Sequence, residues 1–369
     1  MLLKYYSNIQ ETRKIAYGLL GLIAIGYGLA FALRGFNVFY DERMDFIRGT
    51  RILEYGLEGF YDEEPKISPY PPLALILIAL FRLLFPTLIL FKLAFLLIHI
   101  LDWFIFYIIL ERTNFEIAPF MMLGLLTFPF LRLGLITLHP TDYFFLLFLL
   151  LSIYLYPKDR LLSLILLGLS IATKWYTILA SFFLPYFYYT QQEKRFMFKS
   201  MLILWSSILM GLIIPIVIFP NYLNIYFFHV RKSAEVIKWI TYSYGFSIPV
   251  INLPRNIINV AGYVLIVIGF LASLVIIGRG KSTYVRVLSL SLISFMLFSI
   301  TKQPSLRFCV FPLITTSLEV KERKNLLTLF LSIPLFFFRR GFIQALLVLL
   351  MLFYINFKLS LNSKRKVNL

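Results

Sequence analysis

Carboxylates are concentrated in one segment, residues 41–64, which holds eight of the chain's 18 acidic residues. Asp41, Glu42 and Asp45 open this segment, and Asp41 and Asp45 have the i, i+4 spacing that places two side chains on one face of a helix. An interfacial helix over residues 41–55 would hold them at a membrane surface, where partial desolvation makes a carboxylate a better general base. The segment is therefore a candidate for acid–base chemistry; the alternative is a solvated acidic cap on a loop.

Basic residues form a second candidate site: His229, Arg231, Lys232 and Lys238 lie in a stretch rich in aromatic residues. Arginine holds phosphate with paired, charge-assisted hydrogen bonds, so this stretch predicts binding of a phosphate or pyrophosphate headgroup. The alternative is that these side chains extend toward the phosphates of ordinary membrane lipids. The aromatic residues around them are more typical of an interfacial belt than of a sugar platform.

Five further polar residues stand inside apolar runs or at their edges. Ionisable groups are costly in lipid, so each is expected to have a structural or functional role. Asp102 lies three residues after His99, and we expect a structural hydrogen-bonded pair rather than a proton relay. Lys174 would reach a headgroup or simply extend toward the membrane surface, and His139 and Asp142 share a short turn.

The composition requires that the elements carrying these residues lie in a membrane. The chain has 369 residues, of which 60% are hydrophobic and 15% charged, and its mean hydropathy is +0.83. Apolar runs of about 16 to 23 residues recur along the chain, whereas a spanning strand needs only about 10 residues of alternating polarity. We therefore predict an all-α polytopic membrane protein.

Charge and cysteine content exclude other classes of protein. Cys309 is the only cysteine, so no internal disulfide can form, and no Cys/His group has the spacing of metal ligands. The net charge of +18 comes from basic residues in short breaks between apolar runs, which is the positive-inside pattern and does not indicate nucleic-acid binding. Abundant Leu, Ile, Phe and Lys with scarce Ala are typical of AT-rich prokaryotic genomes, so a prokaryotic plasma membrane is expected.

The positive-inside rule gives a topology with both termini in the cytoplasm. We expect about 12 transmembrane helices (10–13) at residues 15–33, 89–110, 116–137, 142–156, 161–174, 176–189, 200–219, 256–278, 286–301, 308–319, 325–338 and 342–358. Residues 71–85 would pack within the bundle without crossing, because a crossing there would invert every later loop. The external segments are then 35–70, 138–143 and 220–255.

Four short groups of residues follow one another along these segments. The first comprises Asp41-Glu42, Gly56, Tyr61 and Tyr70-Pro71-Pro72-Leu73. The second comprises Phe128-Pro129, His139-Pro140-Thr141-Asp142 and the leucine-rich residues 146–155. The third comprises Gly168-Leu169, Lys174 and Tyr176. The fourth comprises His229-Val230-Arg231 and Tyr242-Ser243-Tyr244, with Lys302-Gln303-Pro304-Ser305 later in the chain.

Over about residues 35–310, these groups make the chain resemble the GT-C class of polyprenyl- or dolichyl-phosphate-sugar-dependent glycosyltransferases. It is most similar to the catalytic subunit of GPI mannosyltransferase I and to bacterial polyprenyl-phosphate-mannose-dependent mannosyltransferases. The resemblance implies one integral membrane domain, 1–369, in which residues 1–200 form the module typical of the class and residues 201–369 a variable module. It also implies inverting transfer of a sugar, mannose in the closest relatives, to a hydroxyl of a glycolipid or glycan on the extracytoplasmic face.

The resemblance also implies roles for individual residues. Asp41 is the first choice for the general base, followed by Asp45 and Glu42. The donor phosphate would be bound by His229, Arg231, Lys174 and Lys232. Substrate would contact His139, Asp142, Tyr61, Tyr70 and Gln303. No cofactor is required, although a Mg²⁺ or Mn²⁺ ion near the acidic residues and a small membrane subunit are compatible with the class, whereas nucleic acid is not an expected partner.

The acidic motif departs from the class. The Asp-x-Asp of the closest relative is replaced by Tyr40-Asp41-Glu42, and alignment from Gly56 brings Glu42 nearest to the second aspartate. Two other functions stay open: a lipid or glycolipid transporter or flippase, in which Asp102 and Lys174 carry coupling charge, and a noncatalytic lipid-binding subunit. Replacement of Asp41 would separate them, because only a transferase should lose its activity.

Overall fold

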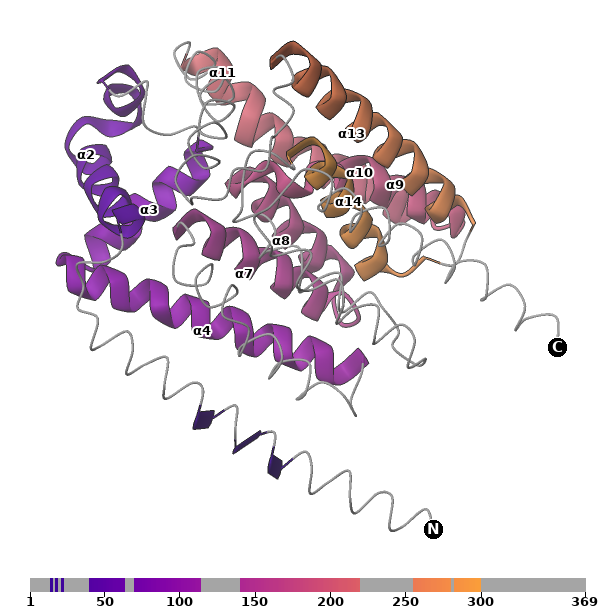
Figure 1. The fold of residues 1–369 in the computed structure, drawn as a ribbon, viewed down its shortest axis with the longest axis horizontal. Helices are drawn as coiled ribbons and strands as arrows, with labels where there is room; N and C mark the ends of the chain where they lie inside the picture. Colours follow the sequence, from indigo (N-terminus) through magenta and orange to yellow (C-terminus); the bar gives the residue numbers. More distant parts are fainter. Residues whose placement is uncertain are drawn as a thin grey trace, which may run out of the picture.

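The computed structural model describes residues 40–63, 70–113, 140–219, 255–279 and 282–299, with a few positions between 14 and 22. Every regular element in these ranges is a helix (Figure 1). Two of the described helices, Leu88–Arg112 and Lys194–Ile218, are long and apolar enough to cross a membrane. The bent pair Arg160–Thr173 and Trp175–Thr190 would add a third crossing if it is one span.

The described part of the chain is therefore all-helical, as predicted, and contains two or three candidate membrane spans. The predicted total of about 12 crossings is not confirmed. Several predicted spans, at 116–137, 308–319, 325–338 and 342–358, lie outside the described residues.

The described helices form three consecutive groups. The first contains α2 (Tyr40–Glu63), α3 (Pro72–Leu84) and α4 (Leu88–Thr113). The second contains α7 (Pro140–Leu155), α8 (Arg160–Thr173), the 3₁₀ turn η1 (Trp175–Thr177) and α9 (Ala180–Thr190). The third contains α10 (Lys194–Ile208), the π-helical turn η2 (Leu209–Ile213), α11 (Ile214–Ile218), α13 (Arg255–Gly278) and α14 (Tyr284–Ser299).

The helices are arranged as a bundle with α4 on one side and α13 on the opposite side (Figure 1). α7 packs between α4 and α8, and α10 packs against both α8 and α9. The short helix α3 has 13 residues, about 20 Å at 1.5 Å per residue, which is too short for a hydrocarbon core of about 30 Å. It packs against α2 and α8 and buries Ala74, Leu75 and Ile78, as expected for a segment within the bundle.

The chain reverses direction between α8 and α9, which are bent by 119° at the break after Thr173. Asp159 caps the start of α8 by accepting hydrogen bonds from the backbone N–H groups of Leu161 (2.9 Å) and Leu162 (3.0 Å). Arg160 donates to Glu193, just after the end of α9, at 2.6 Å. The two basic loops that flank this pair of helices therefore lie together, and their side of the membrane remains a prediction.

The same end of the bundle contains a buried hydrogen-bond network around Tyr284, and we call it the Tyr284 end. The Tyr284 hydroxyl lies 2.7 Å from the Ser152 hydroxyl of α7 and 3.1 Å from the Ser163 hydroxyl of α8. Its ring stacks on that of Tyr156 with centroids 3.9 Å apart and an interplanar angle of 6°. One phenol thus links α14 to both α7 and α8.

Replacement of Tyr284 by Phe should therefore destabilise the protein. The change removes one hydroxyl and leaves Ser152 and Ser163 with fewer partners in a buried site, which costs about 1–3 kcal/mol. Thermal unfolding of the purified protein in detergent would measure the loss as a lower melting temperature. Tyr189→Phe is the matched control, since Tyr189 is 61% exposed on α9, and an equal loss in the control would contradict the role of the network.

Candidate functional site

Five polar residues from four parts of the chain come together at the other end of the bundle, which we call the Lys174 end. We name them the charge cluster, and all five are at least 91% buried: Asp45, Arg48, Tyr70, Asp142 and Lys174. Two come from α2, one precedes α3, one lies in the first turn of α7, and one follows α8. Burial of so many ionisable groups is expensive, so their arrangement must compensate their charges.

Lys174 reaches the cluster because α8 stops at it. Its backbone is extended (φ −151°, ψ 137°), although its N–H still donates to the carbonyl of Ser170 at 2.9 Å. The chain then makes the single 3₁₀ turn η1 before α9 begins. The Ser170 hydroxyl donates to the carbonyl of Phe145 at 3.1 Å, so the last turns of α8 are fixed against α7.

The Lys174 ammonium forms an ion pair with the carboxylate of Asp142, 32 residues earlier in the chain. The side chains are 8% and 0% exposed, so this pair is buried. It joins the first turn of α7 to the break after α8. The predicted alternative that Lys174 extends toward the membrane surface is wrong, because its side chain is buried and engaged by Asp142.

A second buried ion pair lies within α2, where Arg48 Nη1 donates to Asp45 Oδ1 at i, i+3 spacing. The Arg48 guanidinium is 5.4 Å from the centroid of the Tyr70 ring, and the Lys174 ammonium is 5.5 Å from the same centroid. Cations are attracted to the electron-rich face of an aromatic ring, so Tyr70 bridges the two ion pairs.

Tyr70 is held in place by the second half of α2. Gly56 interrupts this helix with φ 71° and ψ −179°, a conformation essentially restricted to glycine. Beyond this kink, the Tyr61 hydroxyl donates to the Tyr70 carbonyl at 3.0 Å, and the Tyr61 ring lies 5.1 Å from that of Phe219. Burial, followed by the nearby Asp45 carboxylate, raises the pKa of Tyr70, so its phenol stays neutral and is able to donate a hydrogen bond.

The four charged groups of the cluster add up to zero formal charge, because two carboxylates face two cations. Asp45 and Asp142 are each engaged by a cationic side chain, and the described residues contain no group of three side chains suited to hold a metal ion. The Mg²⁺ or Mn²⁺ ion predicted near Asp41 and Glu42 involves side chains outside the description, so we derive no step through a metal.

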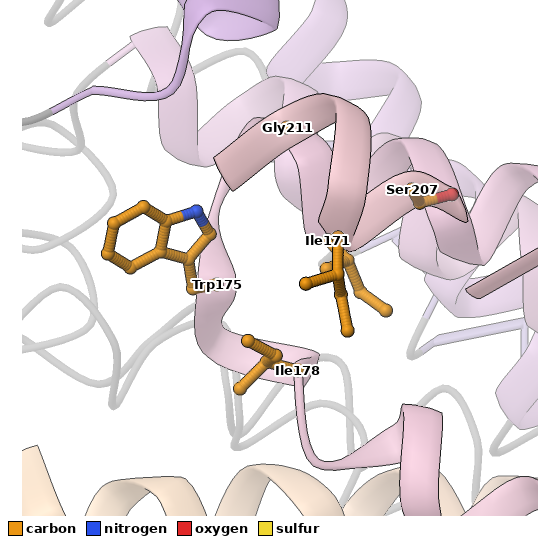
Figure 2. A pocket seen from close by; sticks show the side chains of 6 residues that line it. Ile171, Trp175, Ile178, Ser207 and Gly211 are labelled. Carbon is orange, nitrogen blue, oxygen red and sulfur yellow. The ribbon is translucent and has the colours of Figure 1, made fainter. Parts of the chain in front are cut away.

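An apolar hollow lies beside the break at Lys174 (Figure 2). It is lined by Ile171, Trp175, Ile178, Ser207, Ile208 and Gly211. Figure 2 shows Trp175 on one side of the hollow and Ser207 on the other. Gly211 packs so tightly that an added Cβ would lie 2.9 Å from the Cα of Ala172, so η2 contacts the backbone of α8 directly.

The structure unites five of the residues predicted from sequence: Asp45, Tyr61, Tyr70, Asp142 and Lys174. The side chains of two further candidates, Asp41 and Glu42, are not described, although both residues lie in the first turn of α2. The remaining candidates lie outside the described residues: His139, His229, Arg231, Lys232 and Gln303.

Two observations differ from the sequence reasoning. Arg48 was not predicted as a site residue, although its position three residues after Asp45 in a helical segment was a usable signal. Asp102 is fully buried in α4, and neither of its carboxylate oxygens has a hydrogen-bond partner. The predicted pair with His99 is therefore not seen, and the side chain of His99 lies outside the description.

No family model, curated protein sequence or solved structure matches this chain.

Proposed function

We propose that this protein is a membrane glycosyltransferase that moves a sugar from a polyprenyl- or dolichyl-phosphate carrier to a hydroxyl of a glycolipid or glycan. One observation carries the proposal: residues from three of the four groups identified in the sequence meet in the charge cluster. Asp45 and Tyr70 come from the first group, Asp142 from the second and Lys174 from the third. Residues that act on one substrate must converge in space, and these do so from positions about 130 residues apart.

The reaction needs one carboxylate that is able to accept a proton. An acceptor oxygen attacks the anomeric carbon while the bond from that carbon to the phosphate oxygen breaks, and the electron pair leaves with the lipid phosphate. The acceptor proton passes to the base, and the single displacement inverts the anomeric centre. Asp45 is the candidate base in the described cluster, because its cation Arg48 lies one turn away on the same helix, whereas the Asp142–Lys174 pair joins two separate parts of the fold.

Negative charge that develops on the leaving phosphate must be stabilised by nearby cations. His229, Arg231 and Lys232 keep this role in the proposal. Mannose is favoured as the sugar only by the resemblance to mannosyltransferases. A glycolipid, a lipid-linked oligosaccharide or a protein glycan would each provide the required acceptor hydroxyl, and a small membrane subunit would be a compatible partner.

Sugar transfer by the purified protein in lipid nanodiscs tests the proposal. The donors are radiolabelled decaprenyl-phosphate-mannose and decaprenyl-phosphate-glucose, supplied with a glycolipid extract as acceptor. We expect label to move from the mannose donor to an acceptor lipid and to be absent with heat-inactivated protein. If neither donor loses label to any acceptor, including after addition of a membrane extract that supplies a partner subunit, the proposal fails.

Asp102 favours a second candidate, a lipid or glycolipid transporter. A buried carboxyl without a hydrogen-bond partner, in the middle of the long apolar helix α4, is typical of residues that couple transport to ions or protons. Movement of a fluorescent lipid-linked sugar across proteoliposome membranes tests this function. A transporter should lose this movement in the Asp102→Asn variant, whereas a transferase should show no lipid movement above empty liposomes.

A further inference from the structure

The two ion pairs of the charge cluster differ in what they hold together. Asp142 and Lys174 are 32 residues apart and join α7 to the break after α8, so separating them would release one element from another. Asp45 and Arg48 are one turn apart on α2, which is also anchored to α3 by the hydrogen bond from Arg82 to Thr50 at 2.8 Å. Separation of Asp45 from Arg48 therefore breaks an ion pair within one helix.

We propose that Asp45–Arg48 is an exchangeable pair, in which the phosphate of a polyprenyl phosphate takes the Arg48 guanidinium from Asp45. The inference deepens the proposed function and rests on it for the identity of the ligand. The planar guanidinium fork matches two phosphate oxygens, which the phosphodiester of the sugar donor and the phosphate monoester of the released lipid both offer. The diester carries one negative charge, like a carboxylate, whereas the monoester carries close to two near neutral pH, so the monoester is the stronger partner for Arg48.

Lys174 is the poorer candidate for this exchange. Its ammonium is engaged by Asp142 and lies 5.1 Å from the ring centroid of Tyr176 as well as 5.5 Å from that of Tyr70. Transfer of Lys174 to a ligand would leave the fully buried Asp142 carboxylate without its cation, at a large cost in free energy. Transfer of Arg48 also leaves a fully buried carboxylate, that of Asp45, without this cation, but Asp45 is then able to take up the proton of an acceptor hydroxyl, which neutralises its charge.

The exchange would couple donor binding to activation of the base. While Arg48 faces Asp45, its positive charge stabilises the carboxylate and makes it a weak proton acceptor. The Tyr70 ring and the Asp142–Lys174 pair, which sums to zero charge, also lie in the charge cluster. Once a phosphate holds Arg48, Asp45 becomes more basic, so the acceptor is deprotonated only when the donor is in place.

Binding of decaprenyl phosphate, without sugar, to the purified protein in nanodiscs tests the exchange. Arg48→Gln should weaken binding at least about tenfold, because it removes the phosphate ligand. Asp45→Asn should tighten binding several-fold, because it removes the internal competitor for Arg48. Arg51→Gln is the matched control: it removes an equal charge one turn further along α2, and its binding should stay within about twofold of wild type.

The opposite signs separate the exchange from a structural role. Both single variants leave one buried charge without its partner and should melt at lower temperature, so if Asp45 and Arg48 serve only to stabilise the fold, both should also lose binding. The double variant Asp45→Asn with Arg48→Gln carries no buried charge from this pair, so it should fold and still bind weakly. Wild-type binding by Arg48→Gln, or weaker binding by a folded Asp45→Asn, overturns the inference.

The binding assay also distinguishes this inference from the proposed function. Opposite effects of the two single variants without any sugar transfer would leave the exchange in place and remove the transferase. Sugar transfer together with wild-type binding by Arg48→Gln would remove the exchange and leave the transferase in place.

Discussion

Asp45→Asn is expected to lower the rate of sugar transfer by about 10²–10⁴-fold, the usual contribution of a positioned general base. Asparagine has nearly the shape of aspartate but cannot accept the proton of the acceptor hydroxyl. The donor should still bind, because Arg48 is retained. The measurement is the initial rate of label transfer from decaprenyl-phosphate-mannose at saturating donor, together with the melting temperature of each variant.

Glu54→Gln supplies the control for this prediction, because Glu54 lies on the same helix with its side chain exposed. Its transfer rate should stay within about twofold of wild type. Asp41→Asn tests the first choice made from the sequence. A large loss in Asp41→Asn with a normal rate in folded Asp45→Asn would move the base to Asp41 and contradict the assignment to the charge cluster.

The apolar helices were the most predictable part of the structure. The predicted segments 89–110, 161–174 and 256–278 correspond closely to α4, α8 and α13. The physical reason is that every backbone polar group in hydrocarbon must be hydrogen-bonded within its own helix. The length of an apolar run therefore nearly determines where the helix begins and ends.

The long helix α2 was harder to predict. An interfacial helix was expected over residues 41–55, whereas α2 continues to Glu63 through the kink at Gly56 and packs against α3. The rotation of α2 about its axis decides which carboxylate faces inward, and this rotation depends on packing that spacing alone does not reveal. Asp45 is buried for that reason, together with Ile52 on the same helix, while Leu53 is 47% exposed.

The partners within the cluster could not be read from one sequence. Asp142 and Lys174 were each identified as candidates, but a contact between residues 32 positions apart leaves no periodic signal. Arg48 is one of several arginines in the same segment, with Arg43 and Arg51 one or two turns away. These arginines differ in burial, because Arg48 is buried, Arg51 is half-buried and Arg43 is exposed. Tertiary packing thus decides which of these chemically equal arginines is buried.

Lys174→Met is expected to destabilise the protein by about 3–5 kcal/mol, the usual cost of removing one partner from a buried ion pair. The variant leaves the Asp142 carboxylate fully buried and without its cation at the first turn of α7. Urea unfolding in mixed micelles, followed by tryptophan fluorescence, would measure the loss of unfolding free energy. Arg160→Gln is the control, because the Arg160–Glu193 pair is 40% and 37% exposed and should contribute less than about 1 kcal/mol.

The double variant Asp142→Leu with Lys174→Met decides what this pair does. Replacement of a buried ion pair by apolar side chains of similar size is often neutral or stabilising, so the double variant should recover most of the stability lost by Lys174→Met. If the pair only fixes α7 to the break after α8, the double variant should also recover phosphate binding. A stable double variant that still binds decaprenyl phosphate poorly would instead assign Lys174 a direct contact with the ligand, because binding would then be lost although the fold is intact.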